Sequence, residues 1–407
     1  MYDKFEKFEI TLDKLKQSID GDFGSQKLFL SDALGRVLAE DIIAKEDNPK
    51  DETSSMDGYA IRFEDQKLGE LTIIDKLPAG SYSGLEVKKG ECIKTFTGSL
   101  MSRGSDTLIP IENVEVIDNK IKIISPVSKG FAVRPVGENY KKDEILIKKG
   151  TKLGYAEIGL LAELGYVQVS VFIKPRVAIL ATGSEILDFG EPKTSPAQIR
   201  SSNHITIESI LKDFGAETIR FELIGDDKDA IERKVKEALL QADILITTGG
   251  VSVGDFDFVK EVVGDLKPEY LVDGAFIKPG RHIKIVKLAQ KYIFALPGFP
   301  YSSSVGTFLY ILPFLKAKMG GDFSLPITKA YIEEDYNKRS KYKEFTACNL
   351  LQKDGKVVAN LEGKKVGSSA ILNNMLNNAS LLVIDEETKL IQKGEMVEVI
   401  ELPKLYM

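Results

Sequence analysis

Histidine, cysteine and tryptophan are scarce in this chain. Its 407 residues include two histidines, His204 and His282, two cysteines, Cys92 and Cys348, and no tryptophan. Two cysteines cannot form the disulfide framework of a small secreted domain, and neither has a second Cys or His at a zinc-site spacing. We expect both to be small core residues, kept reduced in the cytosol. An enzyme with so few histidines would work through carboxylates, hydroxyls, lysines, backbone amides or a metal.

Two further absences narrow the class of protein. No segment approaches the roughly 20 apolar residues that a membrane-spanning helix needs. The N-terminal segment 1–16 alternates charged and apolar residues and lacks the apolar centre of a signal peptide. The net charge is −6, so the chain has no general attraction to nucleic acid or anionic membranes. We expect a cytoplasmic protein that binds neither, with any phosphate site confined to one locality.

The order of hydrophobic patterns predicts a multidomain α/β plus β fold. Short β-like runs separated by glycine turns fill the segment up to about 140, which is typical of a small β domain. From 176 to about 320, buried strands alternate with helical patterns, including a helix at 203–214 that ends at Gly215 and a single strand over 284–298. This alternation indicates a doubly wound, largely parallel sheet covered on both faces. A second β pattern, typical of a small terminal β domain, follows residue 325.

The stretch TTGGVSVGDFDF, after the apolar run at 244–246, combines glycines with acidic residues. Its glycines would let backbone N–H groups approach a phosphate, to which the next helix would add its positive end. Asp255 and Asp257 would repel that phosphate unless a cation such as magnesium lay between them. The stretch matches neither the P-loop nor G-x-G-x-x-G, so an ordinary turn stays an open alternative, with Asp255 as a helix cap.

Three other loops of the α/β segment carry similar residues after their strands. One contains Glu185, the next Asp226 and Asp227, and the last is the stretch LPGFPYSS. Since the carboxyl ends of parallel strands meet at one edge, where ligands bind, these loops should lie together. The sequence therefore predicts a nucleotide or pyrophosphate site with a divalent cation at that edge.

Several separate motifs, in this order, resemble those of the molybdopterin molybdenumtransferase family, which includes the C-terminal domain of gephyrin. The resemblance covers nearly the whole chain, and the combination is highly specific. The motifs are SSMDGYAIR (54–62), TFTGS (95–99), RPVGEN (134–139), ATGSEI (181–186), SSNH (201–204), TTGGVSVGDFDF (247–258), IKPG (277–280), LPGFPYS (296–302) and GSS (367–369).

The resemblance implies the last step of molybdenum cofactor biosynthesis. Such enzymes use Mg²⁺, cleave the pyrophosphate bond of adenylylated molybdopterin, release AMP and insert molybdate or tungstate. It also implies a homodimer whose active site is shared between subunits, with substrate handed over by a molybdopterin adenylyltransferase. The four domains of such a subunit would be a linker domain (1–46 with 141–173), an inserted β domain (47–140), an α/β molybdopterin-binding domain (174–324) and a C-terminal β-barrel-like domain (325–407).

The resemblance also assigns roles to single residues. Glu185, Asp226 and Asp257 match the carboxylates of the nucleotide and metal site. Asp57 matches an acid that the other subunit contributes, and Thr97 a hydroxyl of the same β domain. The residues that match the phosphate turn, the remaining cofactor contacts and the oxyanion site are Gly249, Gly250, Ser252, Gly254, Asn203, Pro297, Pro300, Lys278, Arg281, Ser302 and Ser368.

Structural alternatives exist for several of these assignments. Asp57 begins a favoured Asp–Gly turn, Asn203 could cap a helix, and Lys278 could be a solvated loop lysine. Thr97 could satisfy the backbone at a strand end, and Ser368 could lie in a flexible turn. Only the joint pattern favours a site for all of them.

The chain departs from the family pattern mainly around the oxyanion site. Lys341 and Lys343 could replace an arginine missing at 347, although lysine lacks the two-pronged guanidinium. One hypothesis is an active enzyme with altered oxyanion handling, which the intact carboxylates favour. The other is a member without efficient insertion that serves as a pterin-nucleotide sensor or a scaffold. The departures are Asn139, Gly274, Arg281, His282, Phe299 and Ala347.

Overall fold

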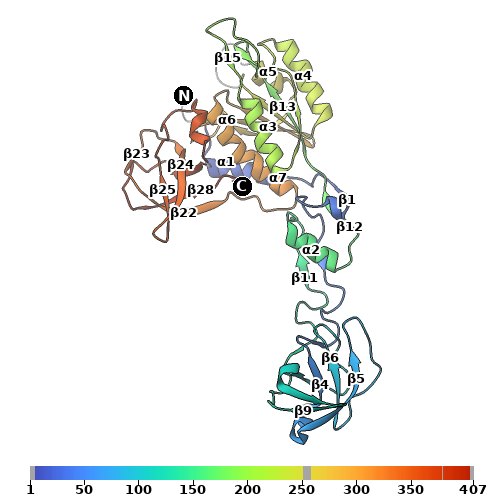
Figure 1. Cartoon of the computed structure of the whole chain (residues 1–407). Coiled ribbons are helices and arrows are strands. Elements are labelled where there is room, and N and C mark those ends of the chain that lie inside the picture. The colour runs from blue at the N-terminus through green and yellow to red at the C-terminus, as the bar shows by residue number, and fades with distance from the viewer. Residues whose placement is uncertain (1–4, 251–257, 378, 404–407) are drawn as a thin grey trace. The chain divides into compact units, whose positions relative to one another are not determined.

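The computed structural model describes residues 5–250, 258–377 and 379–403 (Figure 1). The chain separates into two compact units. Unit 1 comprises Met1–Ala39, Gly150–Gly159 and Tyr166–Met407, and unit 2 comprises Glu40–Lys149 and Leu160–Gly165. The finer division into four domains stays a prediction.

Unit 1 contains a six-stranded mixed sheet that corresponds to the predicted α/β segment. Four strands are parallel, and the last two pair antiparallel at one edge. The predicted single strand over 284–298 is wrong, because a turn at Ala289–Gln290 divides it into a hairpin. In spatial order the strands are β16 (Glu217–Arg220), β13 (Arg176–Ala181), β17 (Ile244–Thr248), β21 (Lys291–Leu296), β20 (Lys284–Leu288) and β18 (Glu269–Asp273).

Helices cover both faces of this sheet, as the alternation predicted (Figure 1). Ile179 packs in the same core as Ile207 of α3, whereas its neighbour Leu180 packs with Val235 of α4 on the other face. Side chains of a strand alternate between faces, so a strand buried on both sides reads as a continuous apolar run. The first face has α1 (Phe8–Gln17), α3 (Asn203–Phe214), α6 (Pro300–Gly306), a π-helical segment (Thr307–Ile311) and α7 (Leu312–Lys318), and the second has α4 (Lys228–Gln241) and α5 (Phe258–Asp265).

The C-terminal part of unit 1 forms a five-stranded barrel, which confirms the β-barrel-like fold expected after residue 325. The first and last strands also pair with each other and close the barrel. In order, the strands are β24 (Lys343–Lys353), β25 (Lys356–Asn360), β22 (Ile327–Ile332), β28 (Met396–Ile400) and β26 (Ser380–Ile384). The short strand β19 (Ile277–Lys278) adds to β24 in parallel, with Lys278 opposite Glu344. The barrel therefore borrows a strand that leads directly into the predicted oxyanion loop.

Smaller elements complete unit 1. Two short strands, β23 (Tyr336–Asn337) and β27 (Leu390–Ile391), pair beside the barrel, and β1 (Ser25–Phe29) pairs with β12 (Gln168–Phe172). The helix α2 (Tyr155–Glu163) divides between the two units.

Unit 2 contains the small β structure expected from the glycine-rich turns. Its core includes Tyr59, Ile109 and Cys92. Its sheet has the order β7 (Thr107–Pro110), β4 (Gly58–Ile61), β6 (Glu91–Thr95), β5 (Glu70–Leu77), β9 (Lys120–Ile123) and β8 (Val114–Ile117). Two further pairs are β3 (Thr53–Ser54) with β10 (Val133–Arg134), and β2 (Ile42–Ile43) with β11 (Ile145–Ile147).

Both cysteines are buried and form no disulfide, as expected. Burial raises the pKa of Cys92 and of Cys348 to about 12, so neither thiol supplies a reactive thiolate at neutral pH. Among the described residues, no helix has the length and apolarity of a membrane span.

Candidate active site

A cleft of about 640 Å³ opens at the carboxyl ends of the parallel strands. The loops after β13, β16, β17 and β21 all line it, with Glu185, Asp226, Gly249 and Pro297 among their residues. Lys278, the last residue of β19, and Arg281, in the loop after that strand, also line the cleft. The fold thus brings together residues from five segments that lie up to more than one hundred positions apart in the sequence.

The glycine turn after β17 is specified by close backbone contacts. Gly249 has a φ of +90°, and a Cβ there would lie 2.6 Å from the carbonyl oxygen of Thr182. A Cβ on Gly250 would lie 2.8 Å from a methyl carbon of Val259. Only glycine fits either place, so the turn keeps a bare backbone at the cleft. The remaining predicted residues of this stretch, Ser252, Gly254, Asp255 and Asp257, lie outside the described residues.

Two carboxylates, Glu185 and Asp226, line the cleft. Asp226 is fixed by a reciprocal pair of hydrogen bonds: its Oδ2 accepts from the Ser184 N–H at 3.0 Å, and its own N–H donates to Ser184 Oγ at 2.9 Å. In the part of the chain that the structure describes, no three His, Cys, Asp or Glu residues gather as a metal site. Two carboxylates nevertheless fit Mg²⁺, which takes one or two protein carboxylates and completes its shell with water and phosphate oxygens.

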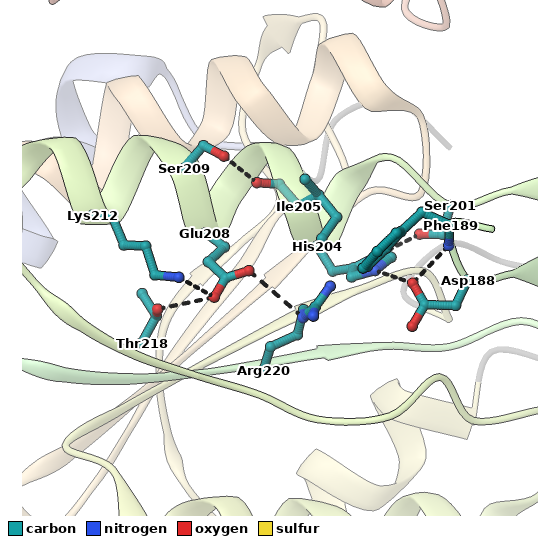
Figure 2. Close-up of polar contacts among 10 residues, drawn as sticks. All are labelled: Asp188, Phe189, Ser201, His204, Ile205, Glu208, Ser209, Lys212, Thr218 and Arg220. Carbon is teal, nitrogen blue, oxygen red and sulfur yellow. Dashed lines mark hydrogen bonds and ion pairs between the residues drawn. The ribbon is translucent and has the colours of Figure 1, made fainter.

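A buried histidine anchors the segment that carries Glu185. That segment contains β14 (Ile186–Leu187) and returns through β15 (Ile199–Arg200) to α3. His204 is 1% exposed. Its Nδ1 lies 2.9 Å from Ser201 Oγ and its Nε2 lies 3.1 Å from Asp188 Oδ1 (Figure 2). His204 therefore connects the residues that directly follow β14 and β15 to the first turn of α3.

A second contact fixes the same segment to the sheet. The guanidinium of Arg220, on β16, lies 5.1 Å from the ring centroid of Phe189 and 3.6 Å from a carboxylate oxygen of Glu208 on α3 (Figure 2). Glu208 is also held by Lys212 at 2.7 Å. We infer that this network orients the loop that presents Glu185.

Asn203 connects α3 to the loop after β21. Its Nδ2 donates to the carbonyl oxygen of Gly298 at 2.7 Å. The capping position is Ser202, which makes no side-chain cap, so the interpretation of Asn203 as a helix cap is wrong. Pro300 opens α6, where its missing N–H costs no helical hydrogen bond. The buried Thr182 Oγ1, in a residue that lines the cleft, has no hydrogen-bond partner among the described residues and could bond a ligand.

The two cations of the cleft have defined partners. Lys278 Nζ lies 3.3 Å from Glu344 Oε1, so it is not a freely solvated lysine. Arg281 donates from Nη1 to Tyr342 Oη at 3.2 Å and from Nε to His282 Nε2 at 3.1 Å. These contacts hold both positive groups at the cleft.

The predicted oxyanion residues divide between two adjoining clefts. Ser302 lines the first, with Arg281, whereas Ser368 lines a second cleft of about 920 Å³. Lys278 lines both, and the Ser302 N–H donates to the carbonyl oxygen of Ser369 between them at 3.3 Å. Lys278 is thus the cation that the two clefts share.

Comparison with known proteins identifies the family. Residues 6–165 match the family model described as MoeA N-terminal region (domain I and II), and residues 178–317 match the probable molybdopterin binding domain. A molybdopterin molybdenumtransferase of Staphylococcus epidermidis is 32% identical, over 91% of this chain and 90% of its own. The chain belongs to the molybdopterin molybdenumtransferase family.

Other relatives agree with this assignment. A molybdopterin molybdenumtransferase of Staphylococcus aureus is 35% identical over 78% of this chain and 77% of its own. The crystal structure of a molybdopterin biosynthesis MoeA protein from Pyrococcus horikoshii is 30% identical, with a TM-score of 0.82 over 98% of this chain and 100% of that one. The chain therefore has the multidomain MoeA-like fold over nearly its full length.

Several departures from the family motifs have structural explanations. Phe299 occupies the N-cap position of α6, where its ring makes no capping hydrogen bond, and is 58% exposed. Ala347 is buried in β24. Lys343 does not replace the missing arginine, because its Nζ pairs with Glu9 and Asp385 at 2.7 Å each. Lys341 lies over the rings of Phe276 and Tyr342 and does not line either cleft. Asn139, in unit 2, forms hydrogen bonds with Arg134 and Asn48.

Gly274 and His282, two other departures, both contact Phe5. Gly274 has a φ of +91°, and a Cβ there would lie 2.4 Å from the Phe5 ring. That ring packs edge-on against His282, with centroids 5.5 Å apart. The N-terminal segment therefore fills the space that a side chain at 274 would take and braces the loop carrying Arg281.

Gly274→Ala is expected to lower the free energy of unfolding by about 2 kcal/mol or more, because the backbone is strained and Phe5 must move. Gly355→Ala is the matched control, since Gly355 has a φ of +73° and nothing within 4 Å of its added Cβ. The control should lose about 1 kcal/mol. Urea denaturation measures the free energy of unfolding of both variants. Equal losses would show that Phe5 does not oppose a side chain at position 274.

In unit 2, Asp57 and Thr97 form one polar group. Asp57 Oδ1 accepts from the Thr97 N–H and from Thr97 Oγ1, both at 2.8 Å. These two hydrogen bonds hold the pKa of Asp57 below its usual range, so the exposed carboxylate is ionised at neutral pH. Thr97 orients Asp57 and does not satisfy the strand backbone.

The sequence interpretation missed several residues that line the two clefts, among them the following three. Glu344 is buried beside Lys278, Tyr342 contacts Arg281, and Arg339 lines the second cleft. The only sequence signal for Glu344 is that a carboxylate stands within the alternating apolar pattern of a strand. Tyr342 and Arg339 have no such signal in the sequence.

Proposed function

We propose that this protein inserts molybdate or tungstate into adenylylated molybdopterin, cleaves the pyrophosphate bond and releases AMP. The main support is the meeting, in one cleft, of a bare glycine turn, two carboxylates, and the side chains of Lys278 and Arg281. Family membership fits molybdenum insertion into molybdopterin.

The nucleotide would bind at the ends of the parallel strands. The turn at Gly249–Gly250 would lie against the phosphates. Glu185, Asp226 and Asp257 would hold Mg²⁺, which when bound would offset negative charge on the pyrophosphate. Water would attack one phosphorus as the bridging P–O bond breaks, so AMP would leave with one phosphate and the other would stay on the pterin.

The oxyanion would bind beside this site. Lys278, Arg281, Ser302 and Ser368 would contribute charge-assisted and neutral hydrogen bonds to its oxygens. Two oxygens of the tetrahedral dianion would leave as water, taking up the two dithiol protons and two protons from solvent, and the two dithiolene sulfurs of the pterin would replace them on the metal. No side-chain nucleophile is needed, because positioning and electrostatic stabilisation account for the chemistry.

We further propose a homodimer in which unit 2 of one subunit supplies Asp57 and Thr97 to the cleft of the other. An exposed carboxylate fixed by two donors suits this role, because its orientation is set before a ligand arrives. The adenylylated substrate would come from a separate adenylyltransferase.

The test is purified protein incubated with adenylylated molybdopterin, Mg²⁺ and either oxyanion. We expect AMP to be released and release to depend on molybdate or tungstate. Absence of AMP release with both oxyanions would reject the enzymatic proposal.

A second candidate is a pterin-nucleotide-binding protein without efficient insertion. The observation that favours it is the pairing of Lys278 with Glu344, which partly neutralises a predicted oxyanion residue. The resemblance also leads us to expect an arginine where this chain has Ala347. This candidate would be supported if the protein binds AMP or pterin but releases no AMP in the assay above.

A further inference from the structure

Glu344 is a buried carboxylate against the lysine that the two clefts share. We propose that Glu344 balances the charge of Lys278 and thereby keeps the affinity of the site for an oxyanion low. The inference rests on the proposed function, because it concerns the oxyanion part of the same site. Glu344 would be an affinity-setting residue that acts through Lys278.

The position of Glu344 is fixed from three sides. Its side chain is 4% exposed, and its Oε1 lies 3.3 Å from Lys278 Nζ. Its Oε2 accepts from the Tyr336 hydroxyl at 2.7 Å, and that hydroxyl lies 3.3 Å from Thr346 Oγ1. The backbone of β24 also pairs with β19 at Lys278. Glu344 cannot turn away to solvent when an anion arrives.

Lys278 is the more exposed partner of this pair. Its side chain is 35% exposed and lines both clefts, so an anion can reach its ammonium group. Lys364, which lines the second cleft, is held by the carbonyl oxygens of Asn374 and Leu376 at 3.0 Å each. Lys278 is therefore better placed than Lys364 to move toward an oxyanion.

Charge decides the sign of the effect. Glu344 cancels the single charge of Lys278 as seen from a nearby dianion and also repels that dianion directly. Removal of the carboxylate charge would free the lysine, while β19 would still hold its backbone. The electrostatic gain should exceed the loss of side-chain order, since Glu344 is buried and poorly screened by salt.

Weak oxyanion binding is useful in a transfer site. The metal must leave its oxygen ligands for sulfur, and tight binding of the free oxyanion would lower its energy without helping the transition state. A partly neutralised lysine would hold the oxyanion loosely enough for transfer.

The experiment measures oxyanion affinity by calorimetric titration of the full chain with molybdate and with tungstate. Glu344→Gln keeps the size of the side chain and an acceptor for Tyr336. It should bind either dianion about tenfold more tightly than wild type and perchlorate with a smaller gain. Unchanged or weaker dianion binding in a folded Glu344→Gln protein would overturn the inference.

Three further variants separate charge from fold. Asp273→Asn removes an exposed carboxylate from another lysine pair, with the largely buried Lys284, and should not change affinity. Lys278→Gln together with Glu344→Gln should lose the gain. If Glu344→Gln does not fold, Tyr336→Phe should weaken binding about twofold, because the carboxylate is released toward Lys278. Equal or tighter binding in Tyr336→Phe would also overturn the inference.

Failure of this inference and failure of the proposed function give different results. AMP release by wild type with unchanged affinity in Glu344→Gln rejects the role of Glu344 alone. No AMP release by wild type rejects the proposed function, whatever the affinities are.

Discussion

Asp226→Asn is expected to lower oxyanion-dependent AMP release about 100-fold or more, whereas Asp227→Asn should stay within about twofold of wild type. Both changes replace one carboxylate by an isosteric amide, at neighbouring positions of one loop. Asp226 lines the cleft. Asp227 instead caps α4, with Oδ1 accepting from the Ala230 N–H at 2.8 Å. The pair of variants thus separates a charge at the site from a charge beside it.

The fold should tolerate both changes. An asparagine at 226 can still accept from the Ser184 N–H, and asparagine caps a helix about as well as aspartate. A magnesium titration of AMP release should show that Asp226→Asn needs a higher Mg²⁺ concentration. Equal activity in the two variants would contradict the assignment of Asp226 to the metal and nucleotide site.

Two inactive variants, Asp57→Asn and Asp226→Asn, should together restore about a quarter of wild-type activity when subunits are mixed at random. Half of the dimers are then mixed, and one of the two sites in each contains neither substitution. Asp57 and Asp226 belong to different units of the chain, so only a site built from two subunits gives this result.

The control is a mixture of Asp57→Asn with Thr97→Val. Both residues belong to the same polar group of unit 2, joined by hydrogen bonds of 2.8 Å. Every mixed site would then contain one damaged unit 2, so no activity should return. No recovery from Asp57→Asn with Asp226→Asn, despite mixed dimers detected by mass spectrometry, would reject the shared site.

Local patterns predicted much of the fold. Strand–helix alternation from 176 onward predicted the sheet with helices on both faces, because apolar runs and amphipathic periods are properties of short segments. The same reasoning predicted that the loops of Glu185 and Asp226 would meet, since parallel strands share one carboxyl edge. The hairpin at Ala289–Gln290 escaped prediction because it has none of the Asn-Gly or Asp-Gly signals of a two-residue turn.

Contacts between distant residues could not be predicted in this way. Lys278 and Glu344 are 66 positions apart, and Asn203 and Gly298 are 95 apart. The sequence around Lys278 or Asn203 does not indicate which partner its side chain meets. The partner of Lys278 depends on how β19 joins the barrel, and that of Asn203 on how α3 lies against the loop after β21. The fit of Phe5 over Gly274 also depends on tertiary packing, with no local signal at either residue.

The most direct test of the account is to count AMP released and metal inserted in one reaction of the purified chain. With adenylylated molybdopterin, Mg²⁺ and molybdate, we predict one molybdenum bound to the pterin product, measured by mass spectrometry, for each AMP released. Asp226→Asn should lower both quantities together. AMP release without metal in the product, or neither product from the wild-type chain, would contradict the account.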